Sequence, residues 1–201
     1  MLRIMGGEYR SRILDCPEGT DVTRPMTSRV KESIFNLLRG WFEGAHVLDL
    51  FAGVGTMGLE AVSRGAASVV LLERDRDVYA ALQRNITRLK CGDRAVALQG
   101  DALGPLPLER APKPVTLAFL DPPYELMMDP DRRRKVLDRA RRLREVMADR
   151  AFLLLRTPVD LPPVEAAIPG FDGPEIHRYG QEMKVYLYMP SAALSPAASP
   201  S

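Results

Sequence analysis

The sequence predicts an α/β fold in which a mainly parallel, doubly wound sheet is covered by helices on both faces. Short apolar segments rich in strand-forming residues alternate with segments whose apolar residues recur at helical spacing. A glycine-rich turn follows the first of these strands. Acidic residues follow several strands, at points that meet on one edge of a parallel sheet. We expect the last strand to run antiparallel, and a small N-terminal β-hairpin or arm to precede the sheet.

Composition fits one soluble globular domain. The chain has 201 residues, of which 46% are hydrophobic and 27% charged. No apolar run approaches the roughly 20 residues that span a bilayer, and no signal peptide is evident, so we expect a cytoplasmic protein with no membrane partner. Cys16 and Cys91 match no zinc or redox spacing, which predicts reduced thiols and no metal site. The net charge of +2 alone does not indicate nucleic acid.

The first part of the chain, residues 1–22, contains short extended pieces on either side of Gly6-Gly7. This pattern suits a hairpin or arm that carries arginines to RNA, but a mobile terminus explains it equally well. A helix from Thr27 or Ser28 to about Gly40 follows. Cations at its start are unfavourable for the helix dipole and hint at an anion there. The basic residues expected to be exposed in these two segments are Arg3, Arg10, Arg12, Arg24, Arg29 and Lys31.

Residues 23–189 form the main domain of this prediction, and the Ala/Ser/Pro-rich tail 190–201 is expected to be disordered. Expected strands are 47–51, 68–73, 95–99, 115–120 and 151–155, and 182–189 is either a last strand or half of a hairpin. Expected helices are 55–64, 75–90 and 131–150. The proline-rich connection 104–114 is poor in helix signals. Arginines of 131–150, Arg139 among them, are expected on a solvated face.

The apolar strand 115–120 ends abruptly in Asp121-Pro122-Pro123-Tyr124. Two consecutive prolines cannot continue a ladder, so the chain must leave the sheet there in a rigid conformation. Asp121 and the carbonyl of Pro122 can each accept a hydrogen bond from an exocyclic amine, and Tyr124 offers a face for stacking on a base. We therefore predict a site that holds a planar base for reaction at its amine. A simpler interpretation is a strand followed by a turn.

The glycine turn Gly53-x-Gly55-x-x-Gly58, with Glu73 20 residues after Gly53, matches a dinucleotide fingerprint. Three observations favour S-adenosylmethionine over NAD. Asp49 before the turn suits a ligand with an ammonium group and would repel a pyrophosphate. Asp101 follows the third strand, where an adenine amine could donate to it. A dehydrogenase, finally, has no evident use for the Asp-Pro-Pro-Tyr segment. Each acid could separately be a turn or cap residue.

The order DLFAGVGTMG, LLERD, GDA, DPPY resembles the Rossmann-like amino-methyltransferases, which implies a class I methyltransferase fold. Together with RIMGGEYRSRIL, TRPMTSRVKESIFNLL and GLEAVSRGAASVVLLE, it resembles the bacterial 16S rRNA (guanine-N2)-methyltransferase family over about residues 1–188. The resemblance implies a catalytic segment Asp121, Pro122, Pro123 and Tyr124. It implies a cofactor site of Asp49, Phe51, Ala52, Gly53, Gly55, Thr56, Gly58, Glu73, Arg74, Asp101 and Ala102. It implies rRNA contacts by Arg3, Arg10, Arg12, Arg24 and Arg29.

By this resemblance the substrate is 16S rRNA in the small ribosomal subunit or its assembly intermediate, and we expect a monomer. A DNA adenine-N6 methyltransferase shares the Asp-Pro-Pro-Tyr segment, but no insertion large enough for a sequence-reading domain is present. An NAD-dependent oxidoreductase and a non-catalytic RNA-binding module are two further candidate functions. The intact catalytic segment and the series of strand-end acids argue against the RNA-binding module.

Overall fold

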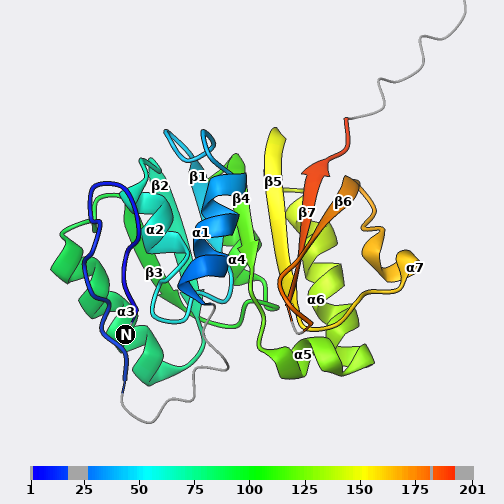
Figure 1. The fold of residues 1–201 in the computed structure, drawn as a ribbon, viewed down its shortest axis with the longest axis horizontal. Helices are drawn as coiled ribbons and strands as arrows, with labels where there is room; N and C mark the ends of the chain where they lie inside the picture. The colour runs from blue at the N-terminus through cyan, green and yellow to red at the C-terminus, as the bar shows by residue number, and fades with distance from the viewer. Residues whose placement is uncertain (1, 18–26, 182, 193–201) are drawn as a thin grey trace, which may run out of the picture.

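The structure is a computed structural model that describes residues 2–17, 27–181 and 183–192. A seven-stranded sheet with the order β3-β2-β1-β4-β5-β7-β6 forms its centre (Figure 1). The strands are β1 (His46–Asp49), β2 (Ser68–Glu73), β3 (Ala95–Gln99), β4 (Val115–Leu120), β5 (Met147–Thr157), β6 (Phe171–Arg178) and β7 (Lys184–Pro190). The helices are α1 (Ser28–Leu37), α2 (Gly58–Ser63), α3 (Arg76–Leu89), α4 (Leu106–Arg110), α5 (Tyr124–Met128), α6 (Pro130–Leu143) and α7 (Pro163–Ala166).

The pairing of the strands confirms the predicted mainly parallel sheet. β1 to β5 are mutually parallel, whereas β7 runs antiparallel to both β5 and β6. Both expectations for residues 182–189 are met by β7, which is the last strand and also the second half of a hairpin with β6. Little in the sequence indicates β6, because most of this edge strand is exposed or half-buried and so shows no apolar alternation.

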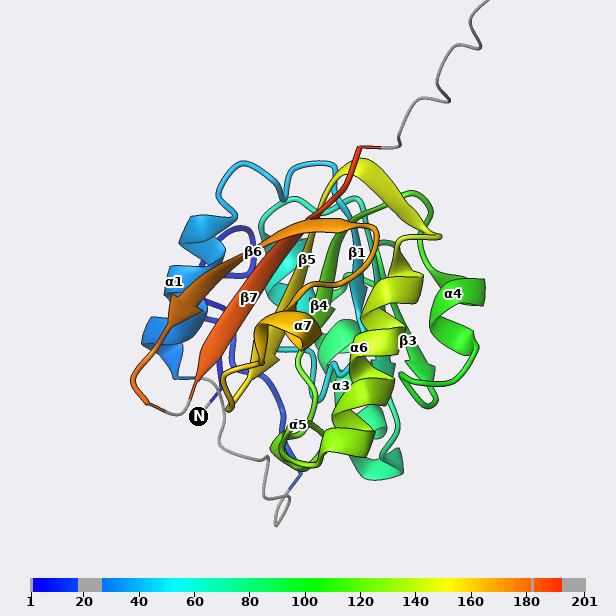
Figure 2. The ribbon, with the colours of Figure 1, turned by 90° about the vertical axis from the view of Figure 1, so that its right-hand side faces the viewer.

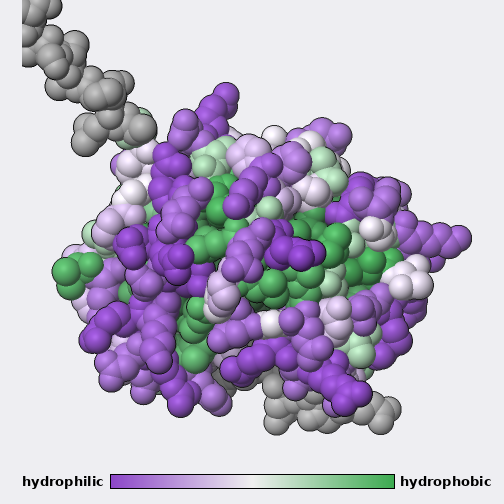
Figure 3. Space-filling model, turned by 180° about the vertical axis from the view of Figure 1, so that it is seen from behind, coloured by the Kyte–Doolittle hydropathy of each residue, from purple (hydrophilic) through white to green (hydrophobic). Residues whose placement is uncertain are grey.

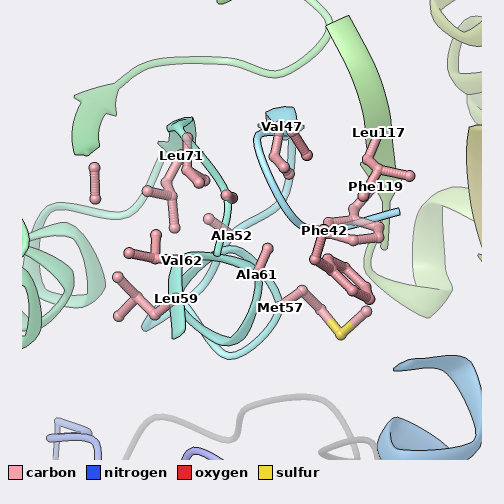
Figure 4. Packing of buried hydrophobic residues seen from close by; sticks show 14 of the residues in the cluster. Phe42, Val47, Ala52, Met57, Leu59, Ala61, Val62, Leu71, Leu117 and Phe119 are labelled. Atoms are coloured by element: carbon pink, nitrogen blue, oxygen red, sulfur yellow. The ribbon is translucent and has the colours of Figure 1, made fainter. Parts of the chain in front are cut away.

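Two hydrophobic cores lie on opposite faces of the sheet, as Figure 2 shows with α1 on one side and α4 and α6 on the other. Neighbouring strand residues alternate between them, with Val47 in the first core and Leu48 in the second. In the first core, side chains of the strands pack on α2 (Figure 4). Both faces are therefore covered, as a parallel sheet requires.

Two predicted boundaries near the second core are wrong. The helix expected over 131–150 ends at Leu143, and β5 begins at Met147, where it pairs with Val115 of β4. Tertiary pairing overrides the weak strand propensity of residues 147–150 there. The connection 104–114 contains the short helix α4, and α5 follows the prolines of the catalytic segment. Arg139 is 4% exposed, so it does not lie on a solvated face.

The N-terminal segment forms the predicted hairpin in minimal form, with one antiparallel bridge between Arg3 and Ile13. Ile4 and Leu14 are buried in the first core, which anchors this arm to the body. Lys31, expected to be exposed, is buried at 6% exposure and forms an ion pair with the fully buried Glu60 at 2.8 Å. Arg24 and residues 193–201 of the expected disordered tail lie outside the described residues.

Candidate active site

The carboxyl ends of β3, β2, β1 and β4 lie in consecutive order on one edge of the sheet. An acidic residue ends each strand or follows it within two positions. These acids are Asp101 after β3, Glu73 at the end of β2, Asp49 at the end of β1 and Asp121 after β4. Because ligands bind at the carboxyl edge of open parallel sheets, this row of acids is a candidate site. The side chains interact electrostatically, since the charges of Asp121 and Glu73 both act on Asp49.

Asp49, at the end of β1, is 1% exposed. The N–H of Gly58, the first residue of α2, donates to its Oδ2 at 2.9 Å. Burial raises the pKa of Asp49 to about 7; the Gly58 hydrogen bond opposes this, and Asp121 and Glu73 add to the rise. Its Oδ1 has no hydrogen-bond partner among the described residues. A buried acceptor without a donor fits a cationic or N–H group supplied by a ligand.

The glycine turn is shaped for close packing on one side and open on the other. A Cβ on Gly58 would lie 2.6 Å from Leu71 and 3.1 Å from Asp49 Oδ2, so only glycine lets α2 start so close to the sheet. Gly53 has a φ of +56°, and a Cβ there would meet nothing within 4 Å. The space beside Gly53 is thus open to a ligand that approaches the backbone.

Glu73 ties the glycine turn to the end of β2. Its Oε2 accepts from the N–H of Gly53 at 3.0 Å, and its Oε1 accepts from the N–H of Asp75 at 2.7 Å. A carboxylate offers about four acceptor positions, so each oxygen keeps capacity for a ligand hydroxyl. Arg74 beside it is exposed. The structure therefore gives Glu73 a role in shaping the turn that the sequence did not indicate.

The remaining candidates for the cofactor lie in the glycine turn itself or directly after β3. Phe51 and Thr56 are half-buried, and Ala52 is buried with its N–H donating to Leu72 O at 2.9 Å. Asp101 is exposed and its Oδ1 accepts from Leu103 N–H at 2.9 Å, so it does form a local turn. Ala102 is buried beneath it.

Asp121 lies at the end of β4 and forms an ion pair with Arg156 on the neighbouring strand β5, through Oδ1 and Nε. Both side chains are largely buried, at 17% exposure for Asp121 and 7% for Arg156. Burial raises the pKa of Asp121, and the Arg156 guanidinium opposes that rise. Nη1 of Arg156 has no partner among the described residues, and its Cζ lies 5.4 Å from the centre of the Tyr124 ring. Pro122 is buried, whereas Pro123 and Tyr124 are half-buried.

Sequence reasoning missed Arg156, although one cation inside the apolar run LLLRT was an available signal. It also missed Asn85 of α3, which is 1% exposed. The Asn85 amide donates to Asp15 O and to Val54 O, each at 3.0 Å, and its Oδ1 accepts from Asp15 N–H at 2.7 Å. Asn85 thereby joins the end of the arm to the glycine turn. Helical position alone gave no sign of this contact.

The predicted RNA-contacting arginines within the described residues, namely Arg3, Arg10, Arg12 and Arg29, are all exposed. No group of three or more metal-ligating side chains that could hold an ion occurs within residues 2–17, 27–181 and 183–192. Over the same part of the chain, no helix is long and apolar enough to cross a bilayer.

Comparisons with known proteins agree on one family. A family model described as Conserved hypothetical protein 95 matches residues 2–187. Ribosomal RNA small subunit methyltransferase D of Escherichia coli is 37% identical over 170 residues, which cover 82% of this chain and 80% of that protein. A solved Escherichia coli structure, provisionally titled methyltransferase yhhF, has 32% identity and a TM-score of 0.75, and the match covers 94% of this chain and 97% of that one.

The fold is shared more widely. Magnesium protoporphyrin IX methyltransferase from Synechocystis, solved with bound SAM, superposes with a TM-score of 0.61 at 15% identity, over 81% of this chain and 79% of that one. At that identity the likeness concerns the fold alone. The fold is thus that of the class I methyltransferases.

Proposed function

The chain belongs to the family described as Conserved hypothetical protein 95, and on this premise we propose that it methylates 16S rRNA of the small ribosomal subunit. The reaction is transfer of a methyl group from S-adenosylmethionine to the exocyclic N2 amine of a guanine. The observation that carries the proposal is the Asp121–Tyr124 segment, which leaves β4 beside the acids and glycine turn of β1 and β2.

The residues around the glycine turn fit S-adenosylmethionine. Asp49 offers a buried acceptor, Oδ1, to the ammonium group. Glu73 has spare acceptor positions for the two ribose hydroxyls, and Asp101 is exposed where an adenine amine can donate to it. Gly53 leaves the space that a close ligand needs. When bound, the cofactor supplies a methyl group already activated by its sulfonium.

The catalytic segment then has to hold the target amine. The rigid Pro122-Pro123 pair fixes the Pro122 carbonyl, and Asp121 keeps a second oxygen beside the one paired with Arg156. Two acceptors orient the amine lone pair toward the methyl group, and the half-buried Tyr124 ring stacks on the base. Positioning of this kind supplies much of the rate because the donor is already reactive.

The exposed arginines Arg3, Arg10, Arg12 and Arg29, with Arg24, contact phosphates of the rRNA in this proposal. The substrate is the small subunit or its assembly intermediate, and the enzyme works as a cytoplasmic monomer. Half or more of such contacts usually go to phosphate and sugar, so these arginines set orientation rather than sequence choice.

The test is methyl transfer from labelled S-adenosylmethionine to small-subunit particles, to free 16S rRNA and to duplex DNA, followed by mass spectrometry of the nucleosides. We expect N2-methylguanosine from rRNA and no product from DNA. N6-methyladenine from DNA would replace this proposal with a DNA adenine-N6 methyltransferase. A melting temperature raised by NAD and not by S-adenosylmethionine would point to an oxidoreductase instead.

A further inference from the structure

A surface pocket of about 310 Å³ lies between α6 and the loop that follows β3. We call the side of the sheet covered by α4 and α6 the back face. Figure 3 shows the molecule from this side, and hydrophilic side chains crowd the part where α6 lies. None of the residues that line the pocket is a cofactor or catalytic candidate, although Leu103 follows Asp101 by two positions and donates its N–H to the Asp101 carboxylate. It is lined by Leu103, Arg134, Lys135, Asp138, Arg139 and Arg142.

Arg139 is the unusual member of this lining because its guanidinium is buried and incompletely paired. Its Nη2 donates to Leu103 O at 2.7 Å and also to Gly104 O. Its Nε and Nη1 have no hydrogen-bond partner among the described residues, and no ion pair to it is found there. A buried cation left with unpaired donors is costly, so an arginine placed like this suits an anionic ligand.

The other charges of the pocket favour an anion too. Lys135 makes no ion pair within the described residues, and Arg142 and Arg134 make long pairs of 3.4 Å with Glu145 and Asp131. Such exposed pairs contribute little and leave the cations available.

The one acid of the pocket, Asp138, is engaged by Arg141 at 2.8 Å. The lining therefore presents four cations against one partly neutralised carboxylate.

We propose that this pocket binds a phosphate group, with Arg139 as its buried donor and Lys135 and Arg142 as its outer donors. Guanidinium groups match phosphate oxygens in geometry as well as charge. A phosphate of the rRNA backbone is one source, and that source rests on the function proposed above. A free phosphate anion has the same chemistry and is the other source.

The position of Arg139 gives the site a consequence for the cofactor. The same guanidinium holds Leu103 and Gly104, and Asp101 of that loop is the residue proposed to meet adenine. A phosphate bound at Nε and Nη1 of Arg139 would hold the guanidinium in place, and the guanidinium in turn holds the loop through Leu103 and Gly104. The pocket thus links the back face of the molecule to the cofactor site.

The experiment compares Lys135→Glu with Arg132→Glu, a matched charge reversal on the same helix at an exposed residue that does not line the pocket. Neither residue belongs to the proposed catalytic or cofactor site, so folding, and cofactor binding measured without phosphate or rRNA, should be unchanged in both. The first measurement is the affinity for 16S rRNA as salt is varied. The second is the melting temperature with inorganic phosphate against chloride at equal ionic strength, without rRNA.

If the ligand is an rRNA phosphate, Lys135→Glu should reduce the slope of log affinity against log salt concentration by about 1, which is about tenfold weaker binding near 0.1 M salt. Arg132→Glu should leave this slope unchanged. For a free phosphate, only the Lys135 variant should lose the stabilisation by phosphate, with rRNA affinity unchanged. If the two variants behave alike in both measurements, the pocket is a solvated helix face and the proposal is wrong. Neither measurement follows methyl transfer, so failure of the proposed activity would be seen separately.

Discussion

The pairing of Asp121 with Arg156 is the contact that most affects the chemistry at the scale of single residues. A buried arginine beside the expected amine acceptor takes one carboxylate oxygen and keeps the other in place. It also lies over the Tyr124 ring, so it orders both side chains of the catalytic segment that would meet the base. Asp121 can therefore act on the amine directly, or serve only to neutralise Arg156.

Replacing Asp121 by alanine separates these roles. We expect methyl transfer to fall by about 100-fold or more, because losing a positioned acceptor typically costs that much, while affinity for S-adenosylmethionine stays nearly the same. The single variant also leaves the buried Arg156 charge without its ion-pair partner, which destabilises the folded protein by roughly 3–5 kcal/mol. The double variant Asp121→Ala with Arg156→Met should regain most of that stability and stay inactive in single-turnover assays. Recovery of activity in the double variant would make Asp121 a partner of Arg156 only.

Asp49 predicts a dependence of cofactor binding on pH. Its pKa of about 7 in the folded protein lies above the ordinary value of about 3.9, so the folded state holds an extra proton between these limits. A cationic ammonium requires the ionised form, and affinity should therefore rise with pH by up to tenfold per unit until about pH 7. The ligand's own α-ammonium, with a pKa of about 7.7–8.0, remains charged over this range.

Calorimetry of S-adenosylmethionine binding from about pH 5 to 7 measures this slope. Asp49→Asn should bind the cofactor more weakly and with no slope, since it cannot ionise. The same raised pKa means that ionised Asp49 disfavours folding above the pKa of the unfolded chain. As pH rises toward 7, the ligand-free parent should therefore lose stability relative to Asp49→Asn. If the cofactor affinity of the parent changes with pH no more than that of Asp49→Asn, Asp49 does not bind the ammonium group.

At the scale of elements, Glu60 of α2 fastens the N-terminal arm to the sheet. Its Oε2 accepts from Met5 N–H at 2.8 Å and its Oε1 from Gly6 N–H at 2.9 Å. Lys31 of α1 and Arg64 pair with the same carboxylate at 2.8 and 2.9 Å. One buried side chain thus joins the arm, α1 and α2, and this explains why the arm is packed rather than extended into solvent.

Glu60→Gln should destabilise the protein by roughly 3–5 kcal/mol, because it leaves the buried Lys31 without its counter-charge. Denaturant unfolding measures this. Arg84→Gln is the control, since it breaks the exposed arm-to-α3 pair with Asp15, at 2.8 Å, and should cost at most about 1 kcal/mol. Equal losses in the two variants would mean that the buried cluster contributes no more than a surface pair.

For the molecule as a whole, the arm that carries the basic residues is held to the body by Asn85. The Asn85 amide donates to Asp15 O at the end of the arm and to Val54 O in the glycine turn. Deleting the arm would remove Ile4 and Leu14 from the core, so a truncation cannot test RNA binding alone. The exposed arginines Arg3, Arg10 and Arg12 are the residues to change instead.

The triple variant in which these three arginines become glutamine should bind 16S rRNA with a salt slope reduced by about 2–3, at about 0.7–0.9 for each phosphate contact. Melting temperature and S-adenosylmethionine affinity should match the parent, because all three side chains are exposed. The comparison is a salt titration of rRNA binding. An unchanged slope would make the arm a structural element without contact to RNA.

The parallel core of the sheet can be predicted from the local sequence alone. Strands β2, β3 and β4 have the predicted bounds because each contains a continuous apolar run, which is visible without a structure; β2 and β4 are buried strands of the parallel sheet, and β3 is its edge. The order of glycines, strand-end acids and the Asp-Pro-Pro-Tyr segment also indicated one edge and one chemistry. The structure confirms the shared edge, because parallel strands necessarily present their carboxyl ends together, while the roles of the residues at this edge stay predictions.

Which charged residues are buried, and which groups they contact, depends on the folded arrangement of distant elements. Lys31, Glu60 and Arg139 belong to elements whose other positions follow ordinary patterns, so neither periodicity nor composition marks them; for Arg156 the apolar run around it was the one available signal. Apart from the local pair of Glu60 with Arg64, their partners lie on other elements: the separation is 29 residues for Lys31 and Glu60, 35 for Arg156 and Asp121, and 36 for Arg139 and Leu103. A buried charge persists only where long-range packing supplies its counter-charge or acceptor, and that partner is fixed by the folded topology rather than by local sequence.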